Sequence, residues 1–352
     1  MPHRASGPAS HFGQQTVGQR VSVRLLAGGR GPSGGPAMRD VVGVLEAVVQ
    51  DASGAQPDQW TVRRRDGSTE RITVDQIVVA KVIPASTAKL RRAKDISAVE
   101  LEQVAARGWQ PLERATVGAW VLRASGGFTG RANSVLPLGD PETELDEALN
   151  CIADWYGERT LPARFQLPMP YATGLDQALA ARGWTAYNPT LVLVADLEQV
   201  RVLAGDRPDL PSVELEDEPT EDWLSVYNYR GQSLPPIARA VMVNAQCPLF
   251  ASVREDPDRG GSTVAVARAA ITDDWVGVTA MDVPAVARRR GLATHTMKGI
   301  LDYARTRGVR YVYLQAAEEN EAALAMYDKL GFSVHHSYHY RVAHPTADYA
   351  SS

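Results

Sequence analysis

Cysteine is scarce in this chain of 352 residues: only Cys151 and Cys247 are present, far apart in the sequence. With no CxxC pair and no cluster of histidines, the sequence argues against a disulfide framework and against a structural metal site. No stretch approaches the ~20 consecutive apolar residues of a membrane-spanning helix, and residues 1–14 lack the apolar core of a signal peptide. We therefore expect a metal-free protein of the reducing cytoplasm, without a membrane partner.

A large net charge is also absent. The 37 Lys and Arg residues nearly balance the 41 Asp and Glu residues, which gives a formal net charge of −4. Such a chain has no global attraction to nucleic acid or to an anionic membrane, so nucleic acid is an unlikely partner and any anion site must be local. A hydrophobic content of 44% is ordinary for a soluble globular protein. The length exceeds what one hydrophobic core usually supports, so we expect two or three domains.

Composition shifts divide the chain into three regions joined by polar linkers near residues 86–95 and 204–211. We expect disordered tails over the first dozen residues and over 346–352. The expected domains are residues 15–84, 95–200 and 210–343.

The first region alternates apolar and polar residues in short runs separated by turn chemistry, which is typical of β-strands. It resembles a small all-β SH3-like barrel. Arg63, Arg64 and Arg65 could form a nucleic-acid patch, but the acidic residues around them favour a solvated hairpin. The expected strands are 21–25, 41–49, 60–63 and 71–82.

An arginine-rich turn stands between a strand-like run, 275–283, and a helix-like run that starts at Leu292 and ends at Gly308. A glycine-containing turn that opens a helix presents free backbone N–H groups and a positive dipole end. The sequence therefore predicts an anion site here, for phosphates. The turn consists of Arg288, Arg289, Arg290, Gly291, Leu292 and Ala293.

A second pattern follows, with a strand candidate at 309–314 and a helix candidate at 320–332. Asn320 and Tyr327 lie seven residues apart, nearly two helical turns, so both side chains lie on one helix face. At this point the sequence resembles the GNAT family of acetyl-CoA-dependent N-acetyltransferases, over about residues 264–342. The residues that match its two motifs are Arg288, Gly291 and Ala293, and then Asn320, Tyr327, Gly331 and Phe332.

The resemblance implies that acetyl-CoA binds at the arginine turn. Backbone N–H groups there would hold the pyrophosphate, and the backbone of Met281 and Val283 would pair with the pantetheine arm. Asn320 would bond to the cofactor arm, although it is equally readable as a helix N-cap. The cofactor-binding residues implied are Met281, Val283, Arg288, Arg289, Arg290, Gly291, Leu292, Ala293, Thr294 and Asn320.

Tyr327 is the implied general acid for the departing thiolate of coenzyme A, the alternative being a packed helix tyrosine. The general base is less defined, because Val278 occupies the position where many family members carry a glutamate. Asp282 is the catalytic candidate nearest to that position. Other carboxylates, each also readable as a surface charge, are Glu214, Glu255, Glu318 and Glu319.

The middle region carries a segment, 175–184, that is similar to the Asn320 helix when Gly183 is aligned with Gly331. Leu179 then replaces Tyr327 and Ala172 replaces Asn320, and residues 135–141 stand in place of the arginine turn without an arginine. Our hypothesis is a duplicated GNAT-like fold whose first copy has lost acetyl-CoA chemistry. The alternative is an unrelated α/β domain.

We therefore expect an α/β protein with a mixed sheet: an SH3-like barrel, a degenerate GNAT-like domain and a catalytic GNAT domain in which Thr220 opens the first helix. The expected function is acetyl-CoA-dependent N-acetyl transfer to a primary amine of a small molecule or a protein lysine, by direct attack in a ternary complex. One alternative is a catalytically inactive module that senses acetyl-CoA. Another is a transferase that uses aminoacyl-tRNA, against which the acidic charge balance argues. The oligomeric state is open.

Overall fold

The computed structural model describes residues 16–30, 36–50, 57–64, 68–82, 92–228, 232–255 and 261–343. The expected tails and most of the first expected linker lie outside these residues. The chain divides into two compact units, Met1–Leu90 and Arg91–Ser352.

The first unit is a five-stranded antiparallel sheet with the order β4-β3-β2-β1-β5. The inward side chains of alternating positions, among them Val21, Leu45 and Trp60, form its core. This strand order supports an SH3-like barrel, which stays a prediction. Its strands are β1 (Arg20–Arg30), β2 (Pro36–Gln50), β3 (Pro57–Arg64), β4 (Thr69–Thr73) and β5 (Ile77–Val82).

Two details of this unit refine the predictions. The expected strand 71–82 is interrupted by a 3₁₀ turn at Val74–Gln76, because the chain changes from pairing with β3 to pairing with β1 there. Arg63 pairs with Glu46 at 2.5 Å, and Arg64 pairs with Glu70. These ion pairs neutralise Arg63 and Arg64, whereas Arg65 lies outside the described residues; the solvated hairpin stays a prediction.

The second unit contains an eight-stranded mixed sheet with the order β11-β12-β13-β14-β15-β10-β16-β9 and a small sheet with the order β6-β7-β8. The expected mixed α/β class is confirmed. Its strands are β6 (Glu113–Val117), β7 (Trp120–Ala124), β8 (Leu136–Pro137), β9 (Arg164–Met169), β10 (Thr185–Asp196), β11 (Val213–Glu216), β12 (Pro248–Arg254), β13 (Thr263–Thr272), β14 (Trp275–Asp282), β15 (Tyr311–Ala317) and β16 (Ser333–Val342). Its α-helices are α1 (Ala98–Gly108), α2 (Leu145–Gly157), α3 (Thr173–Ala181), α4 (Leu197–Ala204), α5 (Glu221–Val226), α6 (Ala238–Val243), α7 (Leu292–Thr306) and α8 (Glu321–Lys329).

The ends of the expected linkers are more ordered than their polar composition suggested. Ala93 is buried in a 3₁₀ turn, and its N–H donates to the Asp196 carboxylate at 3.1 Å. At the second linker, α4 was not expected from the sequence. It forms because Leu197 and Val200 are buried in the core together with residues of α7.

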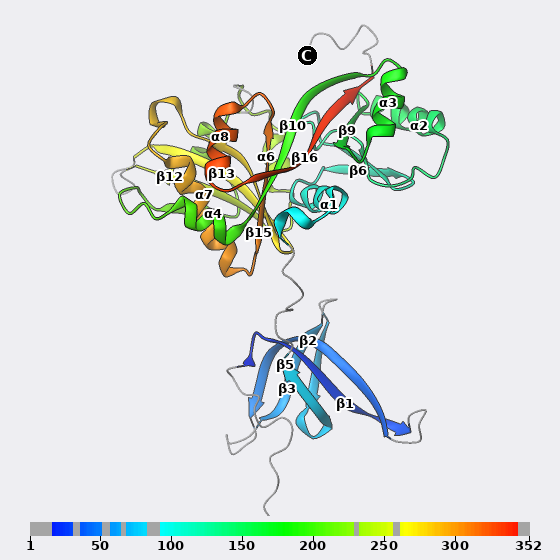
Figure 1. Ribbon diagram of the computed structural model, residues 1–352, viewed down its shortest axis with the longest axis vertical. Coiled ribbons are helices and arrows are strands. Elements are labelled where there is room, and N and C mark those ends of the chain that lie inside the picture. Colours follow the sequence, from blue (N-terminus) through cyan, green and yellow to red (C-terminus); the bar gives the residue numbers. More distant parts are fainter. Residues whose placement is uncertain are drawn as a thin grey trace, which may run out of the picture. The chain divides into compact units, whose positions relative to one another are not determined.

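Strand β10 joins the two halves of this unit. It pairs antiparallel with β15 on one side and with β16 on the other, and β16 in turn pairs with β9. Figure 1 shows β10 and β16 running side by side, with α7 and α8 to one side and α2 and α3 to the other. The regions 95–200 and 210–343 therefore share one sheet within a single compact unit.

The pairing of β10 with β16 has an internal symmetry. The alignment of Gly183 with Gly331 places Thr185 on Ser333 and Val194 on Val342. The two observed end pairs are Thr185 with Val342 and Val194 with Ser333, so the alignment exchanges the two ends of this ladder, whose register shifts in between. Such self-complementary pairing is what two copies of one fold produce when they meet through equivalent strands, and it supports the duplication hypothesis.

Candidate active site

Strands β14 and β15 diverge in the middle of the sheet. They are paired in parallel only from Trp275 with Tyr311 to Val278 with Leu314. Beyond Val278, β14 stays with β13, whereas the rest of β15 stays with β10. The structure therefore opens between residues 279–282 of β14 and residues 315–317 of β15, where the resemblance expects the pantetheine arm.

A bulge in β14 accompanies this opening. Thr279 pairs with Arg268 and Asp282 pairs with Val266, so Ala280 and Met281 together stand opposite the single residue Ala267. Ala280 has a positive φ of 51°. A bulge leaves part of the strand's backbone outside the ladder and bends the strand, which frees backbone groups at the opening.

The arginine turn ends at the first turn of α7. Gly291 is the helix N-cap with a left-handed φ of 84°, and the first helical hydrogen bond runs from the His295 N–H to its carbonyl at 3.0 Å. The N–H groups of residues 292–294 donate to no acceptor within the described residues, and the first turn carries no acidic side chain. Unsatisfied N–H groups at the positive end of a helix favour an anion.

The arginine side chains are partly engaged with their surroundings. Arg288 donates to the Val283 carbonyl at 2.9 Å, and Arg290 pairs with Glu255 at 2.5 Å. A further cation, Arg207, donates to the Arg290 carbonyl at 3.3 Å. The sequence analysis missed Arg207, because it lies in the expected linker and nothing local marks it. Since Glu255 neutralises Arg290, it is a poor candidate for a catalytic base.

Tyr327 lies in the core beneath the opening, with 8% of its surface exposed. Met281 packs against the same cluster of buried side chains, and the Phe332 ring meets the tyrosine ring edge-on at 5.6 Å. Burial raises the pKa of Tyr327 to about 12. Its hydroxyl makes no hydrogen bond to the described residues, so a neutral, proton-carrying phenol is buried beside the diverging strands.

The Asn320 side chain caps α8: its carbonyl oxygen accepts from the Ala323 N–H at 3.2 Å. The N-cap alternative is thereby confirmed. A cofactor contact from this exposed side chain would have to come from its amide nitrogen.

The candidate bases lie at different places. Asp282 is half-buried at the end of β14 and accepts from the Asn228 N–H at 3.3 Å. Glu214 is exposed on the edge strand β11, and Glu318 is exposed in the turn after β15. Glu319, in the same turn, lines a cavity at the opening.

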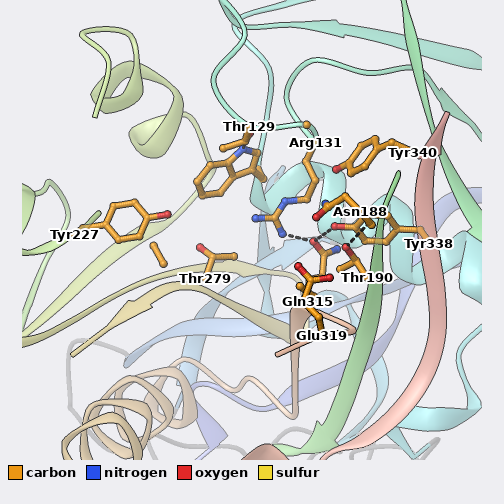
Figure 2. A pocket seen from close by; sticks show the side chains of 14 residues that line it. Thr129, Arg131, Asn188, Thr190, Tyr227, Thr279, Gln315, Glu319, Tyr338 and Tyr340 are labelled. Atoms are coloured by element: carbon orange, nitrogen blue, oxygen red, sulfur yellow. Dashed lines mark hydrogen bonds between the residues drawn. The ribbon is translucent and has the colours of Figure 1, made fainter. Parts of the chain in front are cut away.

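This cavity has a volume of about 450 Å³ and is lined by both halves of the unit. Thr279 and Ala280 come from β14, Gln315 and Ala317 from β15, and Arg131 from the middle region. Figure 2 shows Tyr227 at one side of the cavity and Tyr338 and Tyr340 at the other, with Thr279 and Arg131 between them. The cavity adjoins the point where β14 and β15 diverge. The middle-region residues were not among the expected site residues.

Two kinds of feature are not seen within the described residues. No group of three or more His, Cys, Asp or Glu side chains is arranged to hold a metal ion. No helix combines the length and the apolar character needed to cross a membrane.

Comparison with known proteins identifies the family. A family model described as "Probable histone acetyltransferase Rv0428c C-terminal" matches residues 95–341. The probable histone acetyltransferase Rv0428c of Mycobacterium tuberculosis is 28% identical over 344 residues, which cover 92% of this chain and 94% of that protein. The uncharacterized N-acetyltransferase YobR of Bacillus subtilis is 25% identical over 262 residues, which cover 69% of this chain and 97% of YobR.

Among solved structures, a conserved protein of unknown function from Staphylococcus epidermidis has a TM-score of 0.50 at 12% identity and covers 71% of this chain and 98% of its own. A GCN5-related N-acetyltransferase from Kribbella flavida has a TM-score of 0.49 at 16% identity and covers 70% of this chain and 94% of its own. The first likeness shows a shared fold. Because this family match covers most of the chain, the chain belongs to the family of the Rv0428c C-terminal region and is a GNAT acetyltransferase.

Proposed function

We propose that this enzyme transfers the acetyl group of acetyl-CoA to a primary amine by direct attack within a ternary complex. The observation that carries the proposal is the divergence of β14 and β15 beside a helix whose first N–H groups lack acceptors. Together they offer an anion site for the diphosphate of acetyl-CoA and an adjoining cleft for its thioester arm.

The residues present fit the cofactor. The N–H groups of residues 292–294 would bind the pyrophosphate, and Arg288 and Arg289 would add positive charge, whereas Arg207 is already paired with Asp209 at 2.6 Å. Because Gly291 has no side chain, the diphosphate can approach its backbone closely. A Cβ at this position would also stand 2.4 Å from an Arg207 guanidinium nitrogen. The backbone of Met281 and Val283 would hold the pantetheine arm. When bound, acetyl-CoA supplies an activated acyl group.

Backbone and side-chain groups of this chain would then stabilise the developing negative charge and transfer the protons. A backbone N–H at the β14 bulge, near Met281, would polarise the acyl carbonyl, and a single such donor is worth about 2.7–4 kcal/mol in the transition state. Tyr327 would deliver its proton to the leaving thiolate. Pro284 ends the strand contacts, because it has no N–H to donate.

The base that deprotonates the acceptor is Glu319 or Asp282. Glu319 is favoured because it lines the cavity in which an acceptor would bind. Asp282 remains the second candidate, and its carboxylate already accepts one backbone hydrogen bond. Either carboxylate would act on an amine of pKa ~10, directly or through a water molecule.

The competing function is an inactive acetyl-CoA sensor, which is favoured only by Val278 at the position of the expected glutamate. The enzyme and the sensor can be distinguished by mixing the protein with acetyl-CoA and a panel of amines and measuring the release of coenzyme A thiol. Amine-dependent release supports the enzyme. Tight binding of acetyl-CoA without release in the presence of any amine or lysine peptide would leave the sensor.

Two classes of acceptor remain within the proposal. The mycobacterial relative is described as a probable histone acetyltransferase, which makes protein lysine one class. The cavity lined by both halves has a volume of about 450 Å³, which suits a small molecule and makes a small amine the other class. Native mass spectrometry of freshly purified protein would report a bound small acceptor by its mass.

A further inference from the structure

We infer that the acceptor is a small molecule that carries a carboxylate close to its amine, as an amino acid does, and that Arg131 and Gln315 select it. The inference rests on the proposed acetyl transfer and names the class of its acceptor.

The size of the cavity limits the acceptor. Its volume of about 450 Å³ lies within the range of small-molecule sites, which is roughly 300–1,000 Å³. Its walls come from segments as distant in the sequence as Trp109 and Tyr340, so residues of both halves of the unit line it, and it is partly open to solvent. A whole metabolite fits in such a space.

The middle region contributes one cation, Arg131, to the cavity wall, and a second cation, Arg268 of β13, lies behind it outside the lining residues. The Arg131 guanidinium lies over the Trp109 ring at 5.0 Å from its centre, and the Arg268 guanidinium lies at 4.5 Å from the same centre. Arg268 is 1% exposed and donates to the carbonyls of Met242 and Gly108. Burial, and then the charge of Arg131, lower the pKa of Arg268 to about 9, which leaves it charged at pH 7. Arg131 therefore lines the cavity with a second, buried cation at its back.

Gln315 adds a hydrogen-bond donor at the same place. Its amide oxygen accepts from Arg131 and, at 3.3 Å, from the Tyr338 hydroxyl. These two donors fix the orientation of the amide (Figure 2). Its amide nitrogen is then buried with no acceptor within the described residues. A buried donor without a partner is costly, so a ligand oxygen would be favoured there.

The two groups together match a carboxylate. A planar guanidinium and a neighbouring amide N–H can each donate to one of its two oxygens. Among the described residues that line the cavity, Glu319 supplies the only carboxylate, and it is exposed. Opposite charges at two points of one cavity fit a molecule with an ammonium and a carboxylate group. A protein lysine has no carboxylate beside its ammonium, and Arg131 would repel that ammonium.

The test compares matched amines with and without the carboxylate: lysine with cadaverine, histidine with histamine, and phenylalanine with phenethylamine, together with a lysine peptide blocked at both ends. The protein is used at full length with acetyl-CoA, and thiol release gives kcat/KM. At least one amino acid should exceed its decarboxylated partner by roughly 10- to 100-fold, the discrimination of one charge-assisted contact.

Substitution of Arg131 identifies the group that discriminates. Arg131→Gln should remove most of this preference by lowering turnover of the amino acid and sparing that of its decarboxylated partner. Gln315→Glu, which keeps the acceptor for Arg131 but adds a negative charge, should do the same and serves if Arg131→Gln fails to fold. Arg182→Gln is the matched control, since that guanidinium pairs with Asp146 on the surface at 2.8 Å.

Equal turnover within every matched pair would overturn the inference, as would turnover of the blocked peptide alone. In both of these cases the proposed acetyl transfer would stand. Binding of acetyl-CoA without turnover of any amino acid would also overturn the inference. Failure of the wild-type protein to bind acetyl-CoA would contradict the proposed function itself, and the inference with it.

Discussion

Val278 of β14 forms the last pair of the parallel ladder, and its partner is Leu314 of β15. Both side chains are buried in the core that also holds Tyr327. The sheet therefore stays intact up to this pair and opens beyond it, directly above a buried phenol and next to the start of α7. The proposed chemistry depends on this one point of divergence.

The first prediction concerns the two glycines at the ends of α7. Gly291→Glu should abolish binding of acetyl-CoA, because it places an anion and a side chain where the diphosphate would lie. At about 100 times Kd, acetyl-CoA should stabilise the wild-type fold by about 2.7 kcal/mol, and this stabilisation should vanish in the variant. Thermal or denaturant unfolding with and without acetyl-CoA measures it.

Gly308→Glu provides the control. Gly308 has a φ of 77°, close to the 84° of Gly291, and a Cβ there would meet no atom within 4 Å. Both variants therefore suffer a similar backbone strain of about 1–2 kcal/mol, but only one stands at the anion site. A full acetyl-CoA stabilisation in Gly291→Glu would refute the site.

The second prediction tests whether Tyr327 is a general acid or only a packed core residue. Tyr327→Phe should lower kcat by about 10²- to 10⁴-fold, the usual contribution of a general acid, and leave acetyl-CoA affinity unchanged. Tyr303→Phe on α7, whose hydroxyl accepts from Arg307, should leave kcat as it is. If Tyr327→Phe lost cofactor affinity and turnover together, the tyrosine would be structural.

The third prediction follows from the raised pKa of Tyr327. Its folded-state pKa of about 12 exceeds the ordinary value of 10.0. The stabilising effect of this neutral phenol is thus present below pH 10 and is lost as the pH rises from 10 to about 12. Tyr327→Phe should make the free energy of unfolding less dependent on pH in that window, as measured by urea unfolding. An unchanged pH dependence would mean that the phenol ionises normally.

The fourth prediction distinguishes the candidate bases. Glu319→Gln should lower kcat/KM by roughly 10²-fold, because the variant has no carboxylate to accept the proton of the amine. Asp282→Asn should keep most of the activity. The reverse result would assign the base to Asp282.

The fifth prediction tests the shared sheet. Leu193 of β10 is 3% exposed and packs in the core of the C-terminal half. Leu193→Ala should lower the free energy of unfolding by about 2–5 kcal/mol, as measured by urea unfolding. Val202→Ala on α4, at a position that is 77% exposed, should stay within about 0.5 kcal/mol of the wild type. An effect of Leu193→Ala as small as that of Val202→Ala would contradict this packing.

The parts of the site that local chemistry encodes could be predicted from the sequence. Gly291 at the N-cap of α7 and Asn320 at the N-cap of α8 are such cases. So is Thr220, which opens α5 by accepting from the Trp223 N–H. In each, a few neighbouring residues decide the backbone conformation, and the pattern is visible without the fold.

The rest of the site depends on contacts between distant residues. Arg131 and Gln315 are separated by 184 positions, and β10 enters the sheet between two strands that follow it in the chain. The sequence around Arg131 shows no periodic or compositional pattern that would reveal these contacts. The cavity is therefore lined by residues that are brought together only by the sheet that both halves share.

The most direct measurement is a crystal structure of the full chain with acetyl-CoA. The account predicts the pyrophosphate within hydrogen-bonding distance of the N–H groups of residues 292–294, and the pantetheine arm along Met281 and Val283. Density for the cofactor at another place, or no density at a saturating concentration, would contradict it.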